Sequence, residues 1–451
     1  MPYKKPSVFL PAMALSAALL LSGCGGSDSD AANSNGSGGE SKESAKGKSE
    51  SDFKHLSIFD VEAEVPEDVE RVPLEFAGSP REEMSAHDGK LFTYDNNSLF
   101  VADYATGKPP AGYPTSDGEG SQHAALYRGK GFVELFTLPV AADGYLYFSD
   151  RSVEGEPDDG EQELARFDLA TGLPEVLATT TEFPQITVHD GVLYYLADGL
   201  LTALDTGTGN QLWQVDCDVE SALDVVLAVS DNAVGVMHTY TFDAFNLEDG
   251  EQVVDRDAET FFLGLAAGPD DFYLAERTEE TQSNYFTSAS NVYRINDTSG
   301  DEEKIATTRE TDSPELTNLQ MAVHDGTIVL KSDSEVHAVD EASGETRWIA
   351  SVRDKPFDRE FERDIPYVDL FAAFDADTVY IYATGEAAPD DEDSTSRLLV
   401  LDIASGEVRA AYDIDAPRQS AGPKIDGGNL LIHHAGSSQA DDEVLVLPTV
   451  P

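Results

Sequence analysis

The residues of this chain whose type and spacing first suggest chemistry are histidines. Three of the nine, His87, His189 and His324, each stand immediately before an Asp-Gly pair. Neutral imidazole is a common metal ligand, so histidines that met at one point could bind a transition metal. These three occupy the same place in a repeated phrase, and equivalent places in a repeat are dispersed in space. We therefore expect them in hairpin turns. The adjacent His433 and His434 alternate between the two faces of a strand, so at most one could face a ligand.

Two dense acidic segments, Asp158–Glu161 and Asp390–Asp393, could supply oxygen ligands to calcium. A calcium loop brings its oxygens together through spaced acidic residues and a glycine, and neither segment has that spacing. We expect solvated loops and no metal site, while weak calcium binding stays open. The motifs G-x-S-x-G, H-E-x-x-H, C-x-x-C and G-x-G-x-x-G are absent as well. The sequence therefore predicts no catalytic residue and no enzyme.

The elements that carry these residues belong to a repeat. An Asp or Asn, three variable residues and a Gly recur seven times, about 50 residues apart on average, which is the period of a repeat architecture. The seven are Asp103–Gly107, Asp168–Gly172, Asp205–Gly209, Asn246–Gly250, Asn296–Gly300, Asp340–Gly344 and Asp402–Gly406. An Asp-Gly-like pair precedes each of them and occurs once more near the end; these eight pairs begin at Asp88, Asp143, Asp190, Asp231, Asp270, Asp325, Asp377 and Asp426.

Each repeat unit predicts four short antiparallel strands. Alternating apolar residues flank the Asp-Gly pair, which favours a two-residue hairpin because both central positions take positive φ. A third strand leads into the D-x-x-x-G turn, where the Asp bonds backbone amides and the Gly supplies a positive φ, and a fourth strand follows. Such units indicate an all-β propeller of four-stranded antiparallel blades. We favour eight blades, with seven possible. The chain stops at a third strand, Val444–Leu447, so we expect the N-terminal strand Arg71–Phe76 to close the ring.

The phrase D-G, L-Y, then A-L-D-x-x-T-G-x-x-x-W resembles the repeat of the PQQ-like (quinoprotein) β-propellers. The resemblance is clearest in Asp190–Trp213 and Asp325–Trp348. In that family the Trp docks neighbouring blades. The other units of this chain carry smaller or charged residues at that place, which implies that other packing compensates there: Ala111, Val176, Val254, Lys304 and Ala410.

The same resemblance raises a cofactor question. Alcohol dehydrogenases of the family hold a quinone between a Trp and a disulfide of adjacent cysteines. This chain has only two cysteines, Cys24 and Cys217, far apart, and both its Trp residues belong to the repeat. We therefore expect no cofactor. The non-enzymatic members, which include the lipoprotein scaffold of outer-membrane barrel assembly, imply a scaffold that binds or assembles proteins. A quinoprotein-type dehydrogenase and a cell-wall carbohydrate-binding propeller are the alternatives.

The N-terminus has the pattern of a targeting segment. Lys4 and Lys5 precede an apolar run, Val8–Leu21, that is short for a permanent bilayer span. Leu21–Cys24 resembles a bacterial lipobox, which implies cleavage before Cys24 and lipidation of its thiol. Residues 1–23 would then be a lipoprotein signal peptide, 24–52 a flexible polar tether and 53–451 the propeller. We expect the membrane to be a partner through the lipid anchor, with the protein on the extracytoplasmic face of the cell membrane.

Charge excludes one class of partner. The chain has 29 basic and 86 acidic residues, a net charge of −57. This field repels nucleic acid, so we expect no nucleic-acid partner, and we expect a monomer with an unidentified protein partner. The lone internal thiol, Cys217, stands between Asp216 and Asp218, which predicts a raised pKa and an inert residue.

Three insertions are candidate partner-contacting loops: Lys108–Gly120, Thr278–Ser290 and Lys355–Asp369. The first unit also carries Tyr104, Tyr113 and Tyr127. These rings could stack on sugars or pack the closure of the propeller, and we favour packing.

Overall fold

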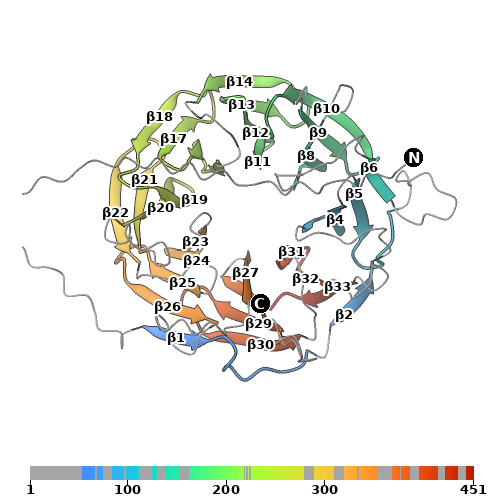
Figure 1. Ribbon diagram of the computed structural model, residues 1–451, viewed down its shortest axis with the longest axis vertical. Helices are drawn as coiled ribbons and strands as arrows, with labels where there is room; N and C mark the ends of the chain where they lie inside the picture. Colours follow the sequence, from blue (N-terminus) through green and yellow to red (C-terminus); the bar gives the residue numbers. More distant parts are fainter. Residues whose placement is uncertain are drawn as a thin grey trace, which may run out of the picture. The chain divides into compact units, whose positions relative to one another are not determined.

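Eight antiparallel sheets follow one another around a central axis, with the first strand of each nearest the axis and the last strand outermost (Figure 1). The structure is a computed structural model. It describes residues 53–66, 69–74, 84–95, 98–110, 124–128, 139–151, 162–217, 219, 222, 225–278, 289–308, 319–332, 335–352, 368–375, 377–385, 396–414, 422–434 and 443–450, all within the unit Glu50–Pro451. The sheets are the blades of a β-propeller, which confirms the predicted fold and the count of eight. No α-helix occurs among the residues just given.

The blades follow the chain in order. Blade 1 is β3 (Met84–His87), β4 (Lys90–Asp95), β5 (Ser98–Asp103) and β6 (Ala124–Arg128); blade 2 is β7 (Val140–Ala142), β8 (Tyr145–Arg151), β9 (Gln162–Asp168) and β10 (Leu173–Thr180); blade 3 is β11 (Gln185–His189), β12 (Val192–Ala197), β13 (Leu200–Asp205) and β14 (Gln211–Asp216); blade 4 is β15 (Val226–Val229), β16 (Ala233–Met237), β17 (Thr241–Asn246) and β18 (Gln252–Asp257). Blade 5 is β19 (Phe262–Ala267), β20 (Asp271–Arg277), β21 (Ser290–Asn296) and β22 (Glu302–Thr307); blade 6 is β23 (Gln320–His324), β24 (Thr327–Lys331), β25 (Glu335–Asp340) and β26 (Thr346–Ser351); blade 7 is β27 (Val368–Asp375), β28 (Thr378–Gly385), β29 (Ser396–Asp402) and β30 (Val408–Ile414); blade 8 is β31 (Lys424–Asp426), β32 (Asn429–His434), β33 (Glu443–Pro448) and β2 (Glu70–Pro73).

The predicted Asp-Gly hairpins join the first and second strands of a blade. At Asp88, Asp143, Asp190 and Asp325 the Asp takes a φ between 44° and 52°, and the Gly after it is also positive. This is the backbone form that a two-residue hairpin between twisted strands requires. The sequence prediction is confirmed at these four blades.

The hairpin of blade 8 differs from the prediction by one residue. Its positive φ values fall on Gly427 (57°) and Gly428 (78°), so Asp426 ends β31 instead of entering the turn. The Asp426 carboxylate then accepts hydrogen bonds from the amides of Asp88 and Gly89 in blade 1, at 3.0 and 2.8 Å. Two adjacent glycines allow either register, and this contact between blades favours the later one.

The D-x-x-x-G turns join the third and fourth strands as predicted. All seven glycines have a φ between 62° and 73°. Each glycine amide donates to the carbonyl of the turn Asp or Asn over 2.7 to 3.0 Å. The side chain of that residue accepts from amides further along the turn, as Asp205 does from Thr208 at 2.7 Å. The turn therefore satisfies its own backbone.

A recurring hydrogen bond ties the two turns of a blade together. The amide of the residue after the turn Asp or Asn donates to the carbonyl of the first hairpin, in seven blades; Thr206 to Gly191 and Glu341 to Gly326, both at 2.9 Å, are examples. The two turns therefore lie side by side on one face of the propeller, and the connections between strands two and three, and from blade to blade, lie on the other.

The ring closes as the sequence predicts. Strand β2 pairs antiparallel with β33, with Val72 opposite Val444, and supplies the outer strand of blade 8. Val72 is 4% exposed and packs in one cluster with Leu91 of blade 1 and Leu431 of blade 8. The expected strand extended to Phe76, but residues 75–83 lie outside the described part of the chain.

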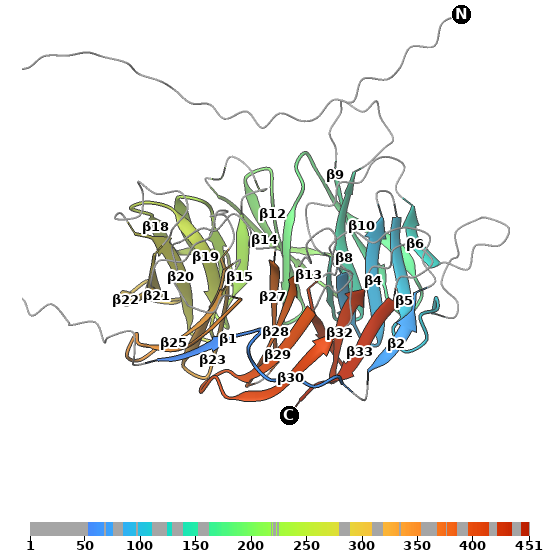
Figure 2. The same ribbon diagram turned by 60° about the horizontal axis from the view of Figure 1, so that its bottom comes forward.

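A second N-terminal strand was not predicted. Strand β1 (Lys54–Ser57) pairs in parallel with β26, so it is a fifth strand on blade 6. Further along, Glu64 forms a bridge with Tyr412 of β30 in blade 7. The segment from Lys54 to Pro73 thus passes the outer edges of blades 6, 7 and 8 in turn (Figure 2).

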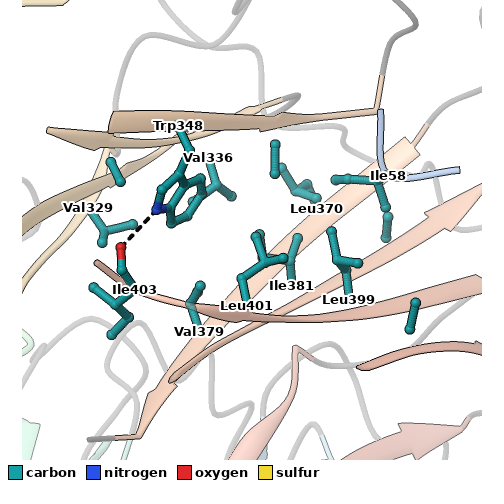
Figure 3. Close-up of a cluster of buried hydrophobic side chains, with 14 residues drawn as sticks. Ile58, Val329, Val336, Trp348, Leu370, Val379, Ile381, Leu399, Leu401 and Ile403 are labelled. Carbon is teal, nitrogen blue, oxygen red and sulfur yellow. Dashed lines mark hydrogen bonds between the residues drawn. The ribbon is translucent and has the colours of Figure 1, made fainter. Parts of the chain in front are cut away.

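Hydrophobic clusters fill the space between neighbouring blades. In the cluster between blades 6 and 7, Trp348 is fully buried and its indole N–H donates to the Ile403 carbonyl at 2.8 Å (Figure 3). The ring covers Gly406, where an added Cβ would lie 2.5 Å from Trp348 Cγ. Trp213 has the same relation to blade 4, because its N–H donates to the Leu247 carbonyl at 2.8 Å. The docking role implied by the family resemblance is confirmed for both tryptophans.

At two turns that no Trp covers, the glycine packs directly on the backbone of the preceding blade. An added Cβ on Gly344 would lie 2.0 Å from the Ile305 carbonyl oxygen, and one on Gly107 would lie 1.9 Å from that of Pro73. The compensating contact is therefore a close approach of two main chains, which only glycine permits.

Candidate protein-binding surface

The axial site of a quinone is not built here. Both tryptophans face the next blade, where their N–H groups are bonded to carbonyls, so neither can cover a planar cofactor on the axis. Cys217 is a free, buried thiol. Burial raises its pKa to about 12, with Asp243 and Asp216 adding to the effect, as the sequence predicted in direction. The tryptophans and the described cysteine are therefore not placed like the quinone-holding residues of the dehydrogenases.

The three repeated histidines do not meet. His87, His189 and His324 end the inner strands of blades 1, 3 and 6, so they lie in separate blades as expected. His189 and His324 each have an Asp of their own hairpin nearby, at 3.8 and 3.9 Å. In the part of the chain that the structure describes, no group of three His, Cys, Asp or Glu side chains could hold a metal ion.

Tyr104 packs the closure of the ring. It is 7% exposed within the cluster that joins blades 1 and 8, and its hydroxyl donates to the Asp426 carbonyl at 3.3 Å. It cannot stack on a sugar, which confirms the packing interpretation for this residue. Tyr113 lies outside the described residues, and so does the side chain of Tyr127.

Several predicted sites fall outside the described residues. These are Cys24, the acidic segments Asp158–Glu161 and Asp390–Asp393, and most of the three insertions. The connectivity still separates the insertions: Lys108–Gly120 joins the third and fourth strands of blade 1, on the turn face. Thr278–Ser290 and Lys355–Asp369 belong to connections on the opposite face.

The outer edges of the blades differ in what covers them. The segment from Lys54 to Pro73 lies along the outer edges of blades 6 and 7 and completes blade 8. Blades 2 and 3, on the other side of the ring, end in β10 and β14, which have no further strand paired to them in the described part of the chain (Figure 1). The edge of a sheet without a partner is a surface available for association.

These two outer strands also expose aliphatic side chains. Leu173 is 64% exposed and Val176 52% exposed on β10, and Leu212 is 52% exposed on β14. Leu173 and Val176 are three positions apart in an unbroken register, so they lie on opposite faces of β10. We call the three residues, which share the outer strands of two blades, the apolar rim. The blades that carry them are neighbours, because Leu177 of β10 packs against Gly209, which precedes β14. Two other large apolar side chains among the described residues are this exposed: Val65 in the N-terminal segment and Tyr240 in blade 4.

The charge pattern sets the apolar rim apart from the strands after it. Strands β10 and β14 carry one charged residue each, Glu175 and Asp216. The outer strands of blades 4 and 5, β18 and β22, carry three charged residues each in six positions. In a chain with a net charge of −57, an exposed aliphatic surface with little charge is a candidate for protein binding. Sequence reasoning missed it, because Val176 was considered only as a substitute for the docking Trp.

One protein-family model matches the sequence of this chain. The family model described as "Outer membrane protein assembly factor BamB" matches residues 156–390, just over half of the chain. The chain belongs to this family. The match runs from the second half of blade 2 through blades 3 to 6 into the first half of blade 7. It includes both docking tryptophans and the apolar rim, and it agrees with the PQQ-like repeat identified in the sequence.

One solved structure with a TM-score above 0.5 supports the fold, and two others are similar to a lesser degree. The computationally designed Ika8 protein is 14% identical, with a TM-score of 0.54, over 84% of this chain and 99% of that one. Sqt1 of Saccharomyces cerevisiae is 12% identical, with a TM-score of 0.49, over 83% and 97%. The quinohemoprotein alcohol dehydrogenase of Comamonas testosteroni is 13% identical, with a TM-score of 0.41, over 70% and 67%. At these identities the likeness concerns the propeller fold alone. No curated protein matches the chain.

Proposed function

We propose that this protein is a lipid-anchored, non-enzymatic scaffold on the extracytoplasmic face of the cell membrane, and that it binds a partner protein through the apolar rim. The observation that carries the proposal is the exposure of Leu173, Val176 and Leu212 on neighbouring outer strands of a strongly acidic chain. Membership of an assembly-factor family agrees with a binding role.

We expect a partner protein to pack its side chains on the apolar rim and not to add a strand to the edge of β10. Pro174 lies in β10 and has no N–H to donate, which blunts this edge for strand pairing. A register shift between Val176 and Ala178 interrupts the strand further. A partner would therefore bury the exposed aliphatic side chains under its own apolar surface, surrounded by the acidic remainder of the propeller.

A crosslinking experiment tests the binding surface. A photo-reactive amino acid replaces Leu212 in one variant and Glu303 in a control. Glu303 lies on the outer strand of blade 5, and its side chain is 67% exposed. We expect a defined crosslinked partner from position 212 and none from 303. Val176→Asp introduced into the Leu212 variant should abolish the crosslink, whereas Val253→Asp on β18 should not. Equal crosslinking from both positions would contradict the proposal.

The anchor is tested separately, because it is independent of the rim. We expect the mature protein to begin at Cys24 and to carry acyl chains, as measured by mass spectrometry of its N-terminal peptide. Cys24→Ala should leave the precursor unprocessed, whereas Cys217→Ala, which removes the buried thiol, should be processed normally. Mature protein that begins elsewhere, or that lacks lipid, would contradict the anchor and leave the binding surface standing.

None of the described segments is a helix long and apolar enough to cross a bilayer.

A further inference from the structure

Strand β1 is a weakly held cover on blade 6. It has four residues, none of them fully buried, and it pairs with β26 alone. The chain becomes firmly fixed only at the next residue, Ile58, which is fully buried between blades 6 and 7 and donates its amide to the Ser351 carbonyl at 2.8 Å. The Arg397 guanidinium also donates to the carbonyls of Ile58 and Val61. A strand of this kind can open while the following segment stays in place.

A histidine lies in the middle of this cover. His55 stands opposite Ile349, which in turn stands opposite His337, so the three side chains lie on one face of the blade. Glu335 and Ser351 lie on the same face, because each is two residues from a member of that row. The Glu335 carboxylate is 2.8 Å from His337 Nε2 and accepts from the Ser351 hydroxyl at 3.4 Å. Both of its oxygens are therefore engaged.

A proton on Nε2 of the His55 ring would have no hydrogen-bond acceptor. This Nε2 atom is buried and has no hydrogen-bond partner. Burial lowers the pKa of His55 below its ordinary value of 6.5, and the charge of Glu335 opposes that effect only in part. Lys54, the neighbouring cation, points to the other side of the strand, where Nζ donates to the Gly406 carbonyl of blade 7. The Arg397–Asp413 ion pair belongs to blade 7 as well.

We infer that β1 is an acid-released cover: protonation of His55 detaches β1 from β26, while Ile58 and Arg397 hold the rest of the N-terminal segment in place. The paired strand holds His55 neutral, and the free strand allows it to bind a proton. The free strand therefore binds more protons than the paired one. The contribution of neutral His55 to pairing is fully present above pH 6.5 and is lost as the pH falls through 6.5 toward the lowered pKa. Release uncovers the outer edge of β26 for pairing with another strand.

Hydrogen exchange measured by mass spectrometry at pH 8 and pH 5 tests the inference. After correction for the intrinsic exchange rate, the population of open β1 should rise on acidification. The rise is limited to about tenfold for each pH unit by which pairing lowers the pKa of His55. The peptide that covers β1 and the peptide that covers β26 should lose protection together. The peptide with β2, which closes blade 8, should keep its protection.

Two variants separate proton sensing from packing. His55→Gln keeps a polar side chain that does not titrate, so β1 should stay protected at both pH values. His324→Gln, which removes the exposed histidine at the end of β23 in the same blade, should leave the pH dependence unchanged. Equal protection of β1 at both pH values in the wild type would overturn the inference. So would a His55→Gln variant that still opens in acid, or one that is open at both pH values, because either result removes the imidazole as the switch.

Discussion

The close approach of blades at the D-x-x-x-G turn leads to a sharp prediction for Gly344. Its φ of +68° costs an alanine about 1–2 kcal/mol. An added Cβ would also lie 2.0 Å from the Ile305 carbonyl oxygen and 3.1 Å from its carbonyl carbon. These are backbone atoms of blade 5 and cannot rotate away, so the clash is relieved only by moving blades 5 and 6 apart. Overpacking of this kind costs about 1–3 kcal/mol more. We expect Gly344→Ala to lower the free energy of unfolding by about 2–5 kcal/mol.

The same blade offers a matched control. Gly326 has a φ of +70°, and an added Cβ there would have Glu341 Oε2 as its nearest neighbour, at 4.0 Å. Gly326→Ala should therefore incur the backbone cost alone, about 1–2 kcal/mol. Both variants are compared with the wild type by urea unfolding, followed by the fluorescence of the tryptophans, of which Trp348 is buried in blade 6. Equal urea midpoints for the two variants would refute the argument that main-chain contact between blades makes this glycine necessary.

Three further outcomes follow from single side chains. Trp348→Phe removes the donor to the Ile403 carbonyl and leaves a void between blades 6 and 7. The free energy of unfolding should therefore fall by about 2–3 kcal/mol in the same urea assay. No change would show that the indole does not dock the blades. Hydrogen bonds from Arg347 and the turn lower the pKa of Asp340 to about 2 from 3.8. As the pH falls, the unfolded chain therefore binds this proton before the folded chain does. The contribution of the Asp340 carboxylate to the free energy of unfolding is lost between about pH 4 and pH 2. Asp340→Asn should flatten the measured dependence of stability on pH in that range, and an unchanged slope would contradict it. With Cys24→Ala in the background, the Cys217 thiol should react with a thiol reagent at pH 8 only in urea, because its pKa is raised to about 12 by burial; rapid reaction of the folded protein would refute this.

The repeat could be predicted because its turns carry residues with a local backbone reason to be there. An Asp-Gly pair favours one kind of hairpin, and the D-x-x-x-G turn satisfies its own amides, so neither depends on distant contacts. Closure by the strand around Val72 also followed from local reasoning, since a blade with three strands lacks its fourth. The exception was Asp426, where two glycines allowed two registers and a contact with blade 1 selected one.

The surface features were not predictable in this way. Strand β1 is four residues long and pairs with a strand almost 300 positions away, so no local pattern marks it. Leu173, Val176 and Leu212 lie in strands of mixed apolar and polar residues that resemble the other strands of the repeat. Whether such a side chain is buried under the next blade or exposed at the rim depends on which strand lies beside it. The amino-acid sequence does not show which strand from a distant part of the chain lies beside a given side chain.

The sequence by itself determined the blade, its two turns, the eightfold repeat and the need for an N-terminal strand to complete it, because each is specified by residues close together in the chain. Only the tertiary structure decided which residues lie between blades and which lie on the rim. It also showed that the N-terminal segment covers blades 6 and 7, while no described strand pairs with the aliphatic outer edges of blades 2 and 3. The physical reason is that closing a ring brings together strands from opposite ends of the chain, and burial is set by those neighbours.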